Sequence, residues 1–194
     1  MFRTVVFAFA ALPFLAGSAI ADCKEDIQAM LASGWDQGSY SIATELSMGG
    51  NPFQHTVQYY RDYSHFYQKV KETGVHWLVL GNQEYTSNDG KSWSPSQTRA
   101  DDWIEKAQTE AARVRNEIKD TECTTEDIDG TTYKKFIHVQ EFEEPMKVTS
   151  TVTTWVDPES NRPVRRHMLN NAGGQEIEID TIFDFETEFQ LPEP

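Results

Sequence analysis

The chain has 194 residues, with 17 basic and 31 acidic side chains and a formal net charge of −14. This charge argues against binding to nucleic acid and against electrostatic docking on anionic membranes. The length suits one domain with a substantial core. Solubility is the simplest use of the excess negative charge, and a basic partner protein is the alternative.

The N-terminal segment has the organisation of a secretory signal peptide. Arg3 is followed by an apolar run over residues 5–16 and then by Ala19-Ile20-Ala21. The run is too short to cross a bilayer, and the small residues match the pattern before a signal-peptidase site. We therefore expect residues 1–21 to be a cleaved signal peptide, with a retained anchor as the alternative. The mature chain, residues 22–194, is expected to be a single domain in a Gram-negative periplasm, with plain secretion as the other destination.

The sequence contains two cysteines, Cys23 and Cys123. In an oxidising compartment an isolated pair is typically a disulfide, which here would join the mature N-terminus to the segment after a long helix. A redox or metal pair is disfavoured because there is no CxxC spacing and no cysteine–histidine cluster. Asp22 directly before Cys23 is a poor match to lipoprotein processing, so a lipid anchor is not expected.

The first part of the mature chain predicts a short helix followed by a strand meander. Apolar residues recur at helical spacing up to Gly34, and then the period changes to two. Glycine-rich turns separate the strands, and Asn88-Asp89-Gly90 is a strong hairpin signal. The expected elements are a helix over 26–33 and strands over 39–48, 53–70 (one long strand, or two meeting at a bend), 75–80, 84–86 and 91–93.

One long helix is predicted over Arg99–Asp120. Its apolar stripe contains several alanines and one tryptophan, which suits close packing on a sheet. Thr98 and Asp101 resemble a capping box at its start. A membrane-surface helix is the alternative, but the polar face carries mixed charge and is not rich in Lys and Arg.

The last third predicts strands over 131–142, 146–156, 163–169 and 175–185, followed by a frayed tail over 186–194. No strand–helix–strand alternation is present, so the sheet should be antiparallel. We therefore expect an α+β fold, mainly antiparallel β. It would be a curved half-barrel sheet with one long helix packed on its concave side and a short N-terminal helix.

No motif in the sequence indicates a catalytic residue. The five histidines show no metal-ligand spacing, and no nucleophile or phosphate-loop motif is present. The acidic pairs Asp101-Asp102 and Glu143-Glu144 suit a helix start and a solvated loop better than acid–base chemistry. We expect no enzyme activity, no catalytic residue, no metal and no cofactor.

The stretch Trp155–Val164, WVDPESNRPV, resembles the W-[IVL]-D-P-x-[ST]-x-x-P-[VL] hairpin of LolA-like periplasmic lipoprotein-carrier proteins. Pro158 presets the turn, Asn161 tolerates a left-handed conformation, and Pro163 can begin an edge strand. A helix between two meanders also resembles the layout of this superfamily, which includes lipid carriers and the sensor module of an envelope-stress regulator. The resemblance implies an incomplete barrel with helices over an apolar cavity that holds acyl chains.

The function expected from this resemblance is transport or binding of a lipid, an acyl chain or a lipid-modified protein, without covalent chemistry, by a monomer. The apolar strand faces and the helix would line the site. The expected lining residues are Leu46, Val57, Tyr59, Trp77, Val79, Ile137, Val152 and Phe183 from strands, and Trp103 and Ile104 from the helix. The alternative is that the aromatic residues simply fill a core, in a periplasmic protein-interaction or envelope-sensing module with the same fold and no ligand.

Overall fold

The computed structural model describes residues 19–34, 38–142 and 147–194, which form two helices and eleven strands. The helices are α1 (Ala19–Ser33) and α2 (Trp103–Glu117). The strands are β1 (Tyr40–Met48), β2 (Asn51–Asp62), β3 (His65–Val70), β4 (His76–Leu80), β5 (Gln83–Ser87), β6 (Ser94–Thr98), β7 (Lys119–Ile128), β8 (Thr131–Phe142), β9 (Val148–Val156), β10 (Pro163–Ala172) and β11 (Gln175–Asp184).

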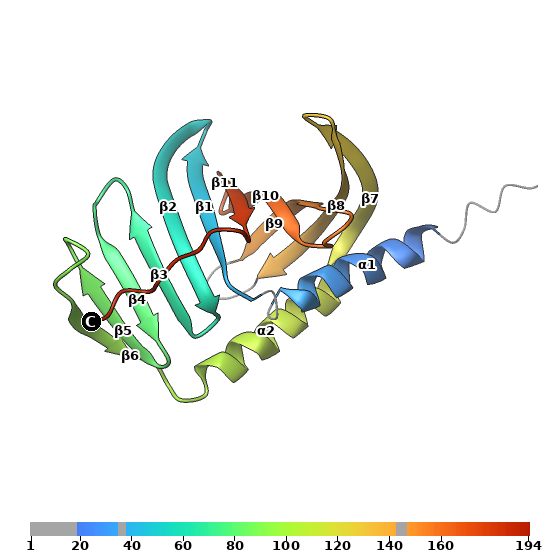
Figure 1. Ribbon diagram of the computed structural model, residues 1–194. Coiled ribbons are helices and arrows are strands. Elements are labelled where there is room, and N and C mark those ends of the chain that lie inside the picture. The colour runs from blue at the N-terminus through green and yellow to red at the C-terminus, as the bar shows by residue number, and fades with distance from the viewer. Residues whose placement is uncertain (1–18, 35–37, 143–146) are drawn as a thin grey trace, which may run out of the picture.

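All eleven strands form one antiparallel sheet in the order β6-β5-β4-β3-β2-β1-β11-β10-β9-β8-β7. The sheet is strongly curved but open, since β6 and β7 are its two edges, and the helices run side by side along it (Figure 1). The expected α+β fold with a curved antiparallel sheet is confirmed.

The two meanders are joined in the middle of the sheet because β1 pairs with both β2 and β11. Thr44 illustrates the seam, since it lies opposite Thr56 on β2 and opposite Thr181 on β11. The hydroxyl groups of Thr44 and Thr181 are 3.3 Å apart and share a hydrogen bond.

The pairing register defines the two faces, because residues directly opposite each other in an antiparallel sheet point to the same side. One row of paired residues crosses eight strands. Its members are Val70, Thr56, Thr44, Thr181, Arg166, Thr154, Phe136 and Cys123. At one end of the row, Phe136 and Cys123 contact α1. We call the side that carries this row the helix face and the opposite side the outer face.

The core next to α1 combines residues from three parts of the chain. Ile27 on α1 is fully buried and packs in one cluster with Phe136 on β8 and Val156 on β9. The disulfide between Cys23 and Cys123 ties α1 to β7 beside this cluster, as the cysteine count predicted. Burial of apolar side chains and a covalent link therefore hold α1 in place.

Helix α2 is shorter than expected, and the predicted capping box is wrong. Thr98 belongs to β6 and donates a hydrogen bond to the Gln83 side chain, while Asp101 accepts one from Asn82. Asp102 is the N-cap residue and makes no side-chain capping bond. Thr98, the expected capping residue, is therefore the last residue of β6 and pairs with β5.

The edge strand β7 was not predicted, and the strand expected over 91–93 lies three residues later, as the edge strand β6. Every residue of β6 is exposed and β7 is mostly polar, so neither shows the apolar alternation that marks a strand. At an edge, backbone hydrogen bonds to one neighbour are enough to hold such a strand. Residues 53–70, expected as one strand or two, form β2 and β3.

The C-terminal tail is more ordered than the predicted frayed end. It leaves β11 and crosses the sheet toward β5 (Figure 1), where the Phe189 ring lies 5.2 Å from that of Tyr59. The predicted turn after Trp155 is present: Asn161 has φ +56°, and the Asp157 carboxylate accepts hydrogen bonds from the backbone of Glu159 and Ser160.

Most of the expected signal peptide, and the Glu143-Glu144 pair, lie outside the described residues. Helix α1 begins at Ala19, so it includes the three small and apolar residues expected before the cleavage site. Neither described helix has the length and apolarity required to cross a bilayer.

Candidate ligand-binding site

A groove of about 380 Å³ lies between the helices and the end of β8. Four segments contribute to its walls: the end of α1, the middle of α2, the β2–β3 turn and the end of β8. The lining residues are Leu31, Tyr63, Ala107, Glu110, Ala111, Val114, Arg115, Gln140 and Phe142. We call this the helix groove.

The groove exists because of the composition of α2. Ala107, Ala111 and Val114 follow the i, i+4, i+7 spacing of one helix face, so they point to the same side. Two of them are alanines, and no residue of α2 is fully buried. Such a stripe of small side chains leaves an apolar space between the helix and the end of β8.

Polar residues, Glu110, Arg115 and Gln140, also line the groove. Glu110 accepts hydrogen bonds from Arg113 at 2.6 and 2.9 Å, and this pairing lowers the pKa of the Glu110 carboxyl. The Gln28 side chain donates to the backbone oxygen of Arg115 at 3.1 Å and so ties α1 to α2. The walls of the groove are thus held by contacts between the two helices.

An aromatic cluster lies on the helix face where β1, β2, β3 and β11 meet. Its members are Tyr40, Tyr60, Phe66, Phe183 and Phe185, with neighbouring rings 4.9–6.4 Å apart. Burial raises the pKa of both tyrosines, and the nearby Tyr63 adds to the effect. Because Tyr63 also lines the helix groove, the aromatic cluster and the groove adjoin.

Arginine side chains stack on this cluster. The guanidinium carbon of Arg166 is 5.4 Å from the Phe183 ring centroid, and that of Arg162 is 4.8 Å from Phe185. At the start of α2, Arg99 lies 4.3 Å from the Trp103 ring and pairs with Glu84 at 2.5 Å. Cation–π contacts of this kind favour a positive charge beside an apolar surface.

The structure divides the ten expected lining residues between the two faces. The register places Leu46, Trp77, Val79, Val152 and Phe183 on the helix face. It places Val57, Tyr59 and Ile137 on the outer face, where Tyr59 packs against Tyr67 and Phe189. Trp103 and Ile104 lie in the first turn of α2, before the residues that line the groove.

The outer-face assignments have a simple physical origin. Adjacent strand residues point to opposite sides, and β2 and β8 carry apolar or aromatic residues at both parities. The sequence pattern of such a strand therefore does not predict which of its two faces is buried. Gln140 and Phe142 were missed for this reason, whereas Arg166 could have been noticed because one of the adjacent Arg165 and Arg166 must face inward.

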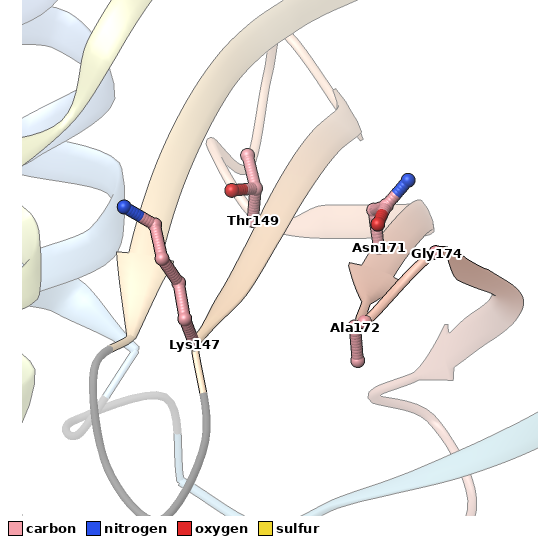
Figure 2. Close-up of a pocket in the computed structure, with 6 residues that line it drawn as sticks. Lys147, Thr149, Asn171, Ala172 and Gly174 are labelled. Atoms are coloured by element: carbon pink, nitrogen blue, oxygen red, sulfur yellow. The ribbon is translucent and has the colours of Figure 1, made fainter.

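Other parts of the molecule are weaker candidates for a binding site. A hollow of about 570 Å³ lies where Lys147 and Thr149, at the start of β9, face the β10–β11 turn. Figure 2 shows that its lining is made mainly of short side chains and backbone. On the outer face His55 bridges Glu45 and Glu72 at 2.9 and 2.6 Å. Within the described ranges, no three His, Cys, Asp or Glu side chains are placed to hold a metal ion.

The molecule is thus a curved antiparallel sheet with two helices and an apolar groove between helices and sheet. No protein-family model and no curated protein matches its sequence. Among solved structures it is similar to a LolA superfamily protein from Nitrosomonas europaea, with 10% identity, a TM-score of 0.37, and coverage of 86% of this chain and 94% of that chain.

Two further structures are similar. For a putative outer membrane lipoprotein-sorting protein domain from Vibrio parahaemolyticus, identity is 10%, TM-score 0.36, and coverage 88% of this chain and 94% of that chain. For MucB in complex with MucA(peri), identity is 14%, TM-score 0.44, and coverage 89% and 59%, so the chain spans less than two thirds of that MucB chain. These likenesses concern the layout of strands and helices alone.

Proposed function

We propose that the protein is a monomeric, non-enzymatic periplasmic binding or carrier protein for a lipid, an acyl chain or a lipid-modified protein. The observation that carries the proposal is the helix groove, an apolar space walled by Leu31, Ala111, Val114 and Phe142 from three different elements. Its volume of about 380 Å³ is within the roughly 300–1,000 Å³ of small-molecule sites. Each Å² of apolar ligand surface buried there would contribute about 25 cal/mol.

The periplasmic location in this proposal is supported by two features of the N-terminal region. The first 21 residues have the pattern of a secretory signal. Two residues later, Cys23 forms a disulfide with Cys123, and such bonds persist in oxidising compartments. An apolar ligand also needs a carrier in an aqueous compartment, because its transfer through water is unfavourable.

Filling the groove tests the proposal. Ala111 lines it, whereas the next residue, Ala112, does not. We expect Ala111→Phe to weaken binding of dodecanoate at least tenfold, because the ring occupies the space of the alkyl chain. Ala112→Phe makes the same change outside the groove and should bind like the wild type. Native mass spectrometry of the mature protein titrated with dodecanoate measures both.

Analysis of the material that co-purifies with the protein is a second test of the carrier proposal. Mature protein isolated from periplasm should carry acyl species that organic solvent extracts, and Ala111→Phe protein should carry less. Protein that is empty and does not bind dodecanoate at all would contradict the carrier proposal. It would instead favour the second candidate, a protein-interaction or envelope-sensing module.

That second candidate rests on the outer face. Val57, Ala43 and Ile182 lie opposite one another across β2, β1 and β11. Ile182 is 60% exposed and Val57 38% exposed, in the middle of a sheet where apolar residues are usually covered. They line a shallow hollow rimmed by Glu45, His55, Arg165 and Asp180. An apolar centre with a charged rim is typical of protein–protein contacts.

A further inference from the structure

Arg166 lies in the middle of the helix face without a counter-charge. It is on β10 and faces Thr181 on β11 and Thr154 on β9. Although the chain has 31 acidic residues, no ion pair of Arg166 occurs in the described part of the chain. Its neighbour Arg165 points to the outer face and pairs with Asp180 at 3.1 Å.

Several buried polar atoms around Arg166 also have no hydrogen-bond partner among the described residues. They are Nε of Arg166, Oγ1 of Thr154 and both ring nitrogens of His138. These residues lie on the adjacent strands β10, β9 and β8, on the same face. Buried polar groups in proteins nearly always have partners, so three neighbouring residues with unsatisfied atoms indicate a place for a polar group from elsewhere.

The charge of this cluster is positive. Burial, and after it the positive charge of Arg166, lowers the pKa of His138 to about 4. His138 is therefore neutral at pH 7 and Arg166 carries the charge of the cluster. Arg166 is partly exposed as a whole residue, while the Nε atom of its guanidinium group is buried. A guanidinium fork matches the oxygens of a carboxylate or phosphate.

The cluster is continuous with the helix groove. His138, Gln140 and Phe142 alternate along β8 and so lie on one face, and the latter two line the groove. On the other side of Arg166, the Phe183 ring leads to the aromatic cluster. An alkyl chain in the groove can thus end beside Arg166.

We propose that Arg166, with Thr154 and His138 beside it, binds the anionic head group of the ligand whose alkyl chain occupies the helix groove. The ligand class is then an amphiphile with one apolar chain and a carboxylate or phosphate end. This inference rests on the proposed carrier function and specifies its ligand.

The test compares three probes of equal chain length, dodecanoate, dodecyl phosphate and dodecanol, by calorimetric titration of the mature protein. Wild-type protein should bind at least one anionic probe ten times or more tightly than dodecanol, and the better of the two identifies the head group. Arg166→Met should lose that preference and keep its affinity for dodecanol. Arg165→Met, which removes the neighbouring charge from the outer face, should behave like the wild type.

A further measurement needs no variant. The ring resonances of His138 in NMR spectra of wild-type protein should shift when the preferred anionic probe is added and stay in place with dodecanol. Equal affinity of all three probes, or equal weakening of all three by Arg166→Met, would overturn the head-group assignment and leave the carrier function standing. Absence of binding for every probe would overturn both.

Discussion

His138 shows how a single side chain can weaken the fold that contains it. The residue is fully buried, its ring nitrogens have no hydrogen-bond partner within the described chain, and its pKa is lowered to about 4 by burial and by Arg166. Leaving buried polar atoms unsatisfied costs free energy, roughly 1–3 kcal/mol for each group. Such an arrangement persists where a ligand needs it, which is the role we propose for this cluster.

His138 predicts a pH dependence of stability. Between pH 6.5 and about 4 the unfolded chain binds a proton that the folded chain excludes, so stability falls as the pH falls. The full difference in the free energy of unfolding is about 3 kcal/mol. Urea denaturation at pH 7.5 and pH 4.5 should show most of this loss, since pH 4.5 is still above the pKa of His138 in the folded protein.

Carboxyl groups with lowered pKa, such as Glu72, act in the same direction at lower pH, so variants are needed to isolate His138. His138→Gln cannot titrate and should lose much less stability between the two pH values. His167→Gln, a change on the outer face, should retain the wild-type loss. Identical losses in all three proteins would show that His138 is not the cause.

At the scale of elements, α1 depends on its attachments. Its buried residues Ile27 and Met30 contact a small cluster, and the disulfide Cys23–Cys123 closes a loop with a sequence separation of 100 residues. Tying two distant points restricts the unfolded chain more than the folded one. The same bond holds Leu31, at the end of α1, near the helix groove that it lines.

Removing the disulfide should therefore destabilise the protein by about 2–5 kcal/mol, a loss of the size usual for native disulfides. The measurement is urea denaturation of wild-type protein with and without reductant. The double variant C23S/C123S should match reduced wild type and be insensitive to reductant. If oxidised wild type and the double variant were equally stable, the bond would have no part in holding α1 on the sheet.

At the scale of the whole molecule, the seam between β1 and β11 makes one sheet from two meanders. The strands nearest to each chain end pair with each other, and the connection between the two meanders runs through α2. Each meander alone would expose an open strand edge at this seam. The two halves should consequently unfold together.

A proline at the seam tests this coupling. Thr44→Pro removes a backbone donor in β1, so we expect a loss of at least about 1 kcal/mol and separate unfolding of the halves. Hydrogen exchange measures the coupling between the two halves. In the wild type, the amides of β4 and β9 should exchange with the same free energy of opening, and in Thr44→Pro these free energies should differ. Thr44→Ala keeps the donor and should keep the coupling. Separate opening already in wild type would contradict the single cooperative sheet.

Much of the local structure was predictable because it depends on near neighbours in the chain. Alternation indicated most strands, Asn161 was expected in a left-handed turn, and the cysteine count indicated the disulfide. The edge strand β7 escaped prediction and β6 was placed three residues too early, because backbone pairing with a neighbour, and not apolar patterning, holds these strands. For the same reason the start of α2 was placed a few residues too early.

The tertiary structure alone decided which side of each strand is inside and what meets there. A strand such as β8 is apolar at both parities, so only its register with β7 and β9 places Phe142 at the groove and Ile137 on the outer face. Arg166 and His138 are 28 positions apart and become neighbours through the pairing of β8, β9 and β10. Local propensity acts over a few residues, whereas a binding site is made by strands that come together only when the sheet forms.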